Sequence, residues 1–479
     1  MRRDAEGIRG EEPAGSVFFA CFAVFLLVAP LYKAGNRPLP LLLLELAAIG
    51  FLVVIVAVHR GPPALPRAMT AAIAILLAYP LLQLIPLPEA WWRALPGHAA
   101  YAAVLDRYAV SEGGIAWRAI SVVPAATEYG WLALLPPLAC LLGAMRLSPA
   151  QAARLMLLLA IMAGAEGLLG LLQAAPGGGG MLYLGNEEPG QNTAIGTFVN
   201  RNHLAALLAM TLPVIVGLLV FDMRPGRRHR NASAPAPASE ALARRALLFA
   251  SAVLILLALL FTRSRAGIAA GLAGLLCSGI VLVRARAASA GTARPAAARH
   301  IVAAMIVLAV LVALAIGVEP IRRGLAPGQI QGSADFRGAI YAATLQAAIE
   351  FFPLGSGLST FADVFPRFQT GDFGGYIDHA HNDYLQGFME LGLAAPVVVV
   401  LLFAAYVTRM RALLREESGR SFTLLQLGAG LGLLPAILHS LFDFALHMPA
   451  NAMWFATLAG VMLHPGVAAR EHHATDSCP

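Results

Sequence analysis

Residues 379–392 read His-Ala-His-Asn-Asp-Tyr-Leu-Gln-Gly-Phe-Met-Glu-Leu-Gly, and they mark the point where a long polar loop gives way to a new apolar run. Asp383 is followed three residues later by Gln386, a pair typical of a capping box, which predicts a helix from Tyr384. The two histidines would then precede a helix N-terminus near a membrane surface. From spacing alone, a helix cap with two solvated histidines is as good an interpretation as a catalytic site.

The composition of the rest of the chain indicates a membrane protein. Of its 479 residues 58% are hydrophobic and only 13% charged, and the mean hydropathy is +0.71, whereas soluble domains carry about 25% charged residues. Apolar runs of spanning length indicate transmembrane helices. The four cysteines show neither a disulfide framework nor metal-ligand spacing. No phosphate-binding glycine loop occurs. We expect no cofactor and no nucleic-acid partner.

These runs predict an all-α, polytopic transmembrane bundle of about 12 spans. The Pro136-Pro137 pair predicts a kink in the fourth of them. The predicted spans lie at about 16–32, 39–58, 68–87, 128–145, 151–174, 203–221, 246–262, 266–283, 300–317, 388–406, 422–440 and 448–464.

The charge distribution predicts the orientation of this bundle. With the N-terminus inside, nearly two thirds of the 34 lysine and arginine residues fall in inner segments, which is the positive-inside pattern. Both termini are therefore expected in the cytoplasm. The predicted organisation is a cytoplasmic N-terminus at 1–15, spans one to nine at 16–317, a large and partly helical periplasmic loop at 318–387, spans ten to twelve at 388–464, and a cytoplasmic tail at 465–479.

The predicted outer face gathers polar residues from distant segments. The loop at 318–387 has about 70 residues, and loops of such length are usually functional. An apolar-periodic stretch at 337–352 predicts a helix in it, opened by Ser333 or Asp335. The candidate binding residues on this face are Asn200, Asn202, His203, Arg263, Arg265, Arg337, His379, His381, Asn382 and Asp443.

The arginines of the short turn at 262–265 indicate an anion site. An arginine at a lipid–water boundary usually snorkels its charge into the solvent. Arg263 and Arg265, however, occupy a turn too short to be a solvated loop, on the face that positive charge normally avoids. Guanidinium groups bind phosphate in a bidentate manner and stay charged at any physiological pH. We therefore expect a diphosphate on a lipid carrier.

The histidines suggest a proton-transfer step. Histidine is the side chain suited to exchange protons near neutrality. A divalent metal is the alternative, because His379 and His381 lie beside Asp378 and Asp383. No second carboxylate-rich motif occurs on the outer face, so no metal is expected.

At this point four short pieces together resemble a known family. They are Gly196-Thr-Phe-Val-Asn-Arg-Asn-His203, Thr262-Arg-Ser-Arg-Ala-Gly267, Gly355-Ser-Gly-Leu-Ser-Thr-Phe361 and His379-Ala-His-Asn-Asp-Tyr-Leu-Gln386. Their order, their common side and the 12-span layout resemble the O-antigen ligase and polymerase superfamily of bacterial envelope proteins. The ligase pattern of His, then Asn, Ser or Gln, then nine residues and Gly fits His381, Asn382 and Gly392. Ala395 stands where that pattern has Gly, Thr or Tyr.

The resemblance implies an activity. Members of this superfamily transfer glycans from undecaprenyl diphosphate at the periplasmic face of the bacterial inner membrane, without nucleotide or metal. By this resemblance His381 is the base that activates the acceptor hydroxyl, and Arg265 and Arg337 hold the diphosphate. The implied partners are the undecaprenyl-diphosphate-linked glycan donor, a glycan or lipid A core acceptor, membrane lipid, and other polysaccharide-assembly proteins.

Several functions remain open at this stage. A polysaccharide polymerase is favoured over an O-antigen ligase because of the Asn200–His203 piece and Ala395, and a protein O-oligosaccharyltransferase is a third possibility. A transporter or lipid flippase is the non-enzymatic alternative, beside a membrane scaffold. A transporter should carry charged residues at the bilayer midplane. Only Glu45 and Glu166 fall within spans, and packing hydrogen bonds are their simplest interpretation.

Overall fold

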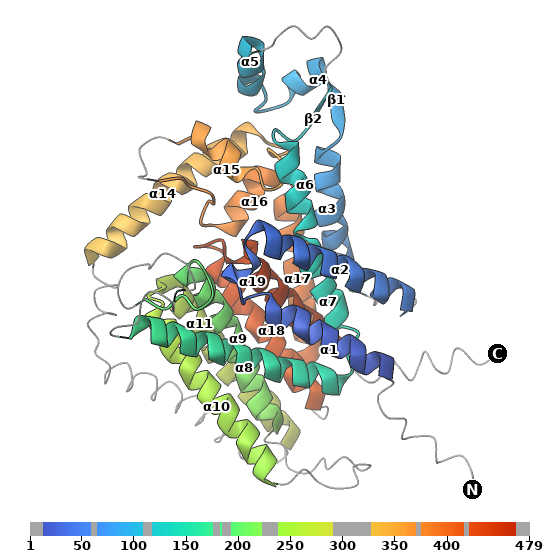
Figure 1. Cartoon of the computed structure of the whole chain (residues 1–479), viewed down its shortest axis with the longest axis vertical. Coiled ribbons are helices and arrows are strands. Elements are labelled where there is room, and N and C mark those ends of the chain that lie inside the picture. Colours follow the sequence, from blue (N-terminus) through green and yellow to red (C-terminus); the bar gives the residue numbers. More distant parts are fainter. Residues whose placement is uncertain are drawn as a thin grey trace, which may run out of the picture.

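The computed structural model describes residues 13–58, 65–108, 117–175, 183, 193–222, 238–290, 327–369, 375–415 and 421–465. Over these residues the chain is an all-α polytopic bundle with one small two-stranded antiparallel sheet (Figure 1). The elements are α1 (Pro13–Val28), η1 (Lys33–Gly35), α2 (Pro38–Val58), α3 (Arg67–Gln83), β1 (Pro86–Pro88), α4 (Glu89–Ala94), α5 (Ala99–Tyr108), β2 (Trp117–Ala119), α6 (Pro124–Leu132), α7 (Leu135–Ala144), α8 (Pro149–Ala174), α9 (Arg201–Asp222), α10 (Ala238–Phe261), α11 (Arg265–Ala290), α14 (Pro327–Glu350), α15 (Phe361–Val364), η3 (Phe365–Arg367), α16 (Asp383–Leu391), α17 (Ala394–Arg415), α18 (Ser421–His439), η4 (Ala445–His447) and α19 (Pro449–Leu463).

The helices confirm the polytopic all-α class. Within the described residues, seven helical segments are long and apolar enough to cross a membrane, and four shorter apolar helices accompany them. Each predicted span that falls in the described part of the chain coincides with one of these helices. The span predicted at 300–317 lies outside the described residues, so the total of 12 stays a prediction.

The span predicted at 128–145 matches the apolar helical segment Pro124–Ala144, and the break between α6 and α7 is the kink predicted from the proline pair. Two predicted boundaries are wrong. The span predicted from residue 388 begins at Ala394, since Gly392 ends α16 with φ of 54°. A Cβ on Gly392 would lie 2.1 Å from the carbonyl oxygen of Pro353, so only glycine fits. Helix α14 starts at Pro327, ahead of the predicted start at Ser333 or Asp335.

Helix α9 is the centre of the bundle, packed against α8, α10, α11 and α18. It is apolar on all sides and almost wholly buried, as such a helix must be. The backbones of α9 and α18 approach each other closely where two glycines face one another. A Cβ on Gly217 would lie only 2.9 Å from the Cα of Gly428. Small residues allow this close approach between membrane helices.

A second, smaller core supports the end of the bundle where α14, α15 and α16 lie together (Figure 1). Phe351, Phe361 and Met389 are among its buried side chains. The turn at 355–357 joins α16 to this core, since the backbone N–H of Gly357 donates to the carbonyl of Glu390 at 3.0 Å. The short sheet, α4 and α5 lie beyond it, at the top of Figure 1. We call this end of the bundle the site end, because it carries the side chains described next.

Candidate functional site

Helix α16 places the histidine loop. The side-chain oxygen of Asn382 accepts hydrogen bonds from the backbone N–H groups of Tyr384 and Leu385, at 3.1 and 3.0 Å, and so caps the helix. The predicted capping box is therefore wrong, and the helix begins one residue earlier than expected. Gln386 instead turns back to accept a hydrogen bond from the backbone N–H of Ala380 at 3.1 Å. The loop is thereby tied to the first turn of the helix.

The backbone of His381 is held in an uncommon conformation. Its φ is 52°, in the left-handed region that a residue with a side chain seldom adopts. Such strain costs on the order of 1–3 kcal/mol and persists only where the surroundings enforce it. Here the hydroxyl of Tyr341 donates to the carbonyl oxygen of His381 at 2.8 Å, and the backbone N–H of Asp383 donates to the carbonyl of Ser440 at 2.9 Å. The imidazole is thus aimed by two elements distant in sequence.

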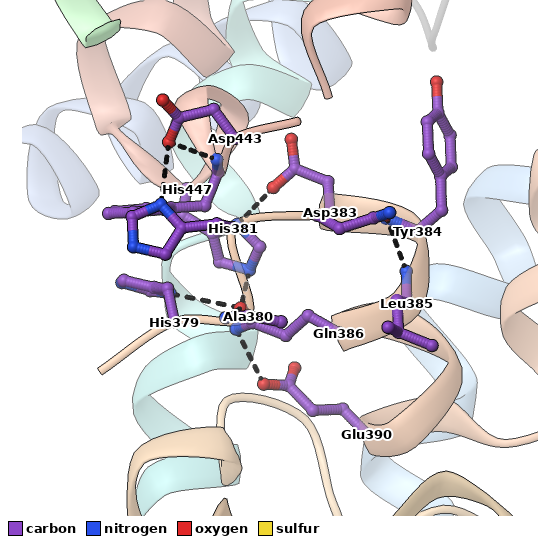
Figure 2. A network of polar contacts seen from close by, with 12 residues as sticks. His379, Ala380, His381, Asp383, Tyr384, Leu385, Gln386, Glu390, Asp443 and His447 are labelled. Carbon is purple, nitrogen blue, oxygen red and sulfur yellow. Dashed lines mark hydrogen bonds and ion pairs between the residues drawn. The ribbon is translucent and has the colours of Figure 1, made fainter. Parts of the chain in front are cut away.

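Asp443 lies between two histidines (Figure 2 shows it with His381). Its Oδ1 is 3.5 Å from Nδ1 of His381 and 3.9 Å from Nε2 of His203, and its side chain is completely buried. Oδ1 also accepts the backbone N–H of Phe444 at 2.8 Å. Burial opposes ionisation, but the contact with His381 and the potential of the neighbouring histidines outweigh it, so the pKa of Asp443 lies below its ordinary value. Asp443 is a carboxylate that can orient an imidazole.

The ring of Phe444 separates the histidines and sets their spacing. Its centroid is 4.1 Å from that of His379, 4.7 Å from that of His203 and 4.9 Å from that of His381. The phenylalanine is 6% exposed. Three imidazoles thus contact one buried aromatic ring.

A second polar chain runs beneath the first. Nδ1 of His447 is 2.7 Å from Oδ1 of Asp383, and its Nε2 is 3.2 Å from Nε2 of Gln386. The Gln386 amide donates to Glu390 at 3.0 Å, and its oxygen is 3.3 Å from Nδ1 of His379. Burial lowers the pKa of His379, whereas for His447 the bond to Asp383 outweighs burial and raises the pKa. The two rings, with centroids 5.0 Å apart, therefore have pKa values shifted in opposite directions.

Four arginines gather next to these histidines. The charges of Arg263, Arg265 and Arg337 all act on Arg201, and so does that of Asp443. They come from three separate places, the first turn of α9, the turn between α10 and α11, and α14. Like charges brought together in this way favour a bound anion.

Arg265 opens helix α11, with Ser264 as its cap. The Ser264 hydroxyl oxygen accepts the backbone N–H of Gly267 at 3.2 Å. Nη1 of Arg265 is buried and has no hydrogen-bond partner among the described residues. A buried guanidinium N–H without an acceptor is costly, and the N-terminus of a helix also attracts negative charge. Both features suit a phosphate oxygen at this point.

The structure brings most of the predicted site residues to the site end. His379, His381, Arg263, Arg265, Arg337, His203 and Asp443 belong to the two clusters described above. Asn200 and Asn202 adjoin Arg201, and the Asn200 oxygen accepts the backbone N–H of Asn202 at 2.8 Å. The oxygen of Asn382 is occupied as a helix cap, and its predicted contact with substrate stays a prediction.

Sequence reasoning missed Arg201, Tyr341 and Phe444 as members of the site. Arg201 stands inside the piece quoted above, and its position between Asn200 and Asn202 was a usable signal. No periodicity or motif distinguishes Tyr341 or Phe444 from ordinary core aromatics. In the described part of the chain no group of three or more histidine, cysteine, aspartate or glutamate side chains is arranged to hold a metal ion.

Glu166 has the structural role that its isolation suggested. Its two carboxylate oxygens accept hydrogen bonds from the backbone N–H and the hydroxyl of Thr197, at 3.0 and 2.9 Å. Thr197 lies in the loop that leads to Arg201. The buried carboxylate in α8 therefore anchors the segment that brings this arginine to the cluster.

Comparison with known proteins agrees with this geometry. Residues 250–400 match the family model described as O-antigen ligase. Over this part the chain is similar to the O-antigen ligase family, whose members are glycosyltransferase-like enzymes. The matched segment contains Arg265, Arg337 and His381, while His203 and Asp443 lie outside it. No curated protein matches the chain.

Proposed function

We propose that the protein transfers a glycan from a lipid-linked diphosphate to an acceptor hydroxyl, at the periplasmic face of a bacterial inner membrane. The observation that carries this proposal is the position of buried Asp443, which contacts His381 and also acts on the arginine cluster. One carboxylate thus joins a candidate base to a candidate diphosphate site. The similarity of residues 250–400 to the O-antigen ligase family supports the same chemistry.

His381 acts as the general base in this mechanism. Nδ1 faces Asp443, so the proton on Nδ1 is directed to the carboxylate and the lone pair on Nε2 is left for the acceptor hydroxyl. Catalytic contacts are often long before substrate binds, and 3.5 Å is of that kind. The acceptor oxygen attacks the anomeric carbon as its proton moves to Nε2. Asp443 then stabilises the imidazolium that forms, as in other base–carboxylate pairs.

The arginines act on the other side of the anomeric carbon. The bond between that carbon and the diphosphate oxygen breaks, and the leaving lipid diphosphate takes the electron pair. Arg201, Arg263, Arg265 and Arg337 supply positive charge where this negative charge develops. No metal is required for this step, since the guanidinium groups provide the compensation.

A polymerase is the favoured form of this activity, with a lipid-linked repeat unit as the acceptor. The ligase alternative uses the same donor and base but a lipid A core acceptor. The two differ in their products: a polymerase gives a ladder of chain lengths on the lipid carrier, and a ligase gives a single transfer to the core.

The test is a transfer assay with purified protein in nanodiscs and a labelled polyprenyl-diphosphate glycan. His381→Ala should reduce the rate on the order of a hundredfold or more, the usual scale of general-base catalysis. His379→Ala is the matched comparison, because its ring also packs on Phe444 but its Nδ1 meets Gln386 and not Asp443. Near-normal turnover in His381→Ala, at equal protein level, would overturn the proposal.

A further inference from the structure

Helices α1 and α2 form a hairpin with an open apolar groove between them. The groove has a volume of about 1170 Å³. Its walls are aliphatic and aromatic, and Val24, Val28, Leu39 and Leu43 are each more than half exposed. An apolar groove in a membrane helix pair favours an apolar ligand chain over water, because contact between apolar surfaces is favourable and contact of apolar walls with water is not.

Positive charge stands at one end of this groove. Arg37 lines its mouth, and Lys33 lies in the turn with its ammonium 5.8 Å from the ring centroid of Tyr32. Neither cation forms an ion pair within the described residues, and Arg37 donates only to the carbonyl of neighbouring Asn36. A ligand with an anionic head and a long apolar tail therefore complements both the mouth and the walls of the groove.

The charged turn adjoins the site already described. A Cβ on Gly35 would lie 3.3 Å from Cβ of Pro449, the first residue of α19 and two residues beyond His447. On its other side the carbonyl oxygen of Pro30 accepts a hydrogen bond from the hydroxyl of Thr197, in the loop leading to Arg201. In Figure 1 the turn of the hairpin lies beside α19.

We propose that the α1–α2 groove binds the lipid chain of the acceptor, a polyprenyl diphosphate whose phosphates meet Lys33 and Arg37. This inference rests on the proposed polymerase function, in which the acceptor is lipid-linked, and extends it by assigning a binding site to the acceptor's lipid chain. The donor diphosphate occupies the arginine cluster on one side of His381, and the acceptor reaches the base from the α19 side. Two lipid-linked substrates can then be bound at once without sharing a phosphate site.

Direct binding can be measured independently of transfer. A polyprenyl diphosphate with a diazirine in its chain is photolysed with the full-length protein in nanodiscs, and the labelled peptides are mapped by mass spectrometry. Labelling of α1 and α2 should fall at least tenfold in Leu43→Trp, which places a bulky ring in the path of the lipid chain along the groove. Leu46→Trp is the matched control. The native Leu46 side chain is 57% exposed, against 58% for Leu43, and lies on the same helix but outside the groove. Equal labelling by a diazirine phosphatidylcholine would mean ordinary bilayer lipid and would overturn the proposal.

Kinetics then assign the groove to acceptor or donor. With donor and acceptor varied separately, Leu43→Trp should raise the acceptor KM at least tenfold and leave the donor KM and kcat unchanged. A short-chain, water-soluble acceptor should be used equally well by both proteins. The double variant Lys33→Gln with Arg37→Gln should reproduce the acceptor effect and guards against misfolding of the tryptophan variant. A rise in the donor KM instead would refute the assignment, whereas absence of transfer by the unaltered protein would refute the proposed function itself.

Discussion

Replacement of Asp443 by asparagine tests the proposed mechanism most sharply. The amide has nearly the volume of the carboxylate, so the packing around Phe444 is kept, but the charge next to His381 is lost. At 3.5 Å and an effective dielectric constant of about 20, one carboxylate stabilises one imidazolium by at most about 5 kcal/mol. The imidazole itself remains, so the loss should be smaller than that limit. We expect kcat to fall by about 10²- to 10³-fold.

The assay compares initial rates of Asp443→Asn, His381→Ala and the double variant at matched protein level. Residues that act as one unit are not additive, so the double variant should be no slower than His381→Ala alone. Asp363→Asn removes an exposed carboxylate at the site end and should leave the rate unchanged. If the two losses multiply in the double variant, or if Asp443→Asn is as active as the control, Asp443 does not act through His381 and the dyad is refuted.

Three further predictions follow from the same geometry. Arg265→Lys keeps the charge but loses the planar fork of the guanidinium group, so it should reduce the transfer rate about 10- to 100-fold, and Arg265→Ala should reduce it further. Arg107→Ala, at an exposed arginine, should leave the rate unchanged. Equal losses in all three variants would indicate that only general surface charge matters. Transfer should survive EDTA, and restoration of an abolished activity by a divalent ion would reassign the histidines as ligands. The hydrogen bond to Asp383 raises the pKa of His447 in the folded protein, so this pair stabilises the fold fully below about pH 6.5, and the stabilisation is lost as the pH rises through the raised pKa. The melting temperature should therefore fall as the pH is raised above that value. The fall should be absent in Asp383→Asn.

The sequence determined the class of fold because a membrane imposes a simple rule on it. Backbone groups in a bilayer must be hydrogen-bonded internally, so long apolar runs are helices. The predicted spans in the described residues accordingly coincide with helices. The errors occurred where single residues decide the backbone, as at Gly392, which separates α16 from α17 through a positive φ. Neighbouring apolar residues conceal such a break from any hydropathy average.

The chemical types of the site residues were also readable from the sequence. His381, Arg265 and Arg337 stand out because charged and titratable residues are rare in this chain. Their grouping at one end followed from the alternation of spans, which returns every second loop to the same face. Arg201 was not predicted, although the alternation of spans and loops places it on the same face as its neighbours Asn200 and Asn202, which were.

Only the tertiary structure decided how these residues are connected. Asp443 reaches His381 across some sixty residues of chain, through the contacts of α16 with η4 and with the carbonyl of Ser440 after α18. The left-handed backbone of His381 depends on Tyr341 in α14, and the spacing of three imidazoles depends on the ring of Phe444. Such contacts join side chains from different helices, and local propensity carries no information about them. The sequence by itself therefore determined a helical membrane protein with basic and imidazole groups on one face, and the packing of the helices decided which carboxylate meets which histidine.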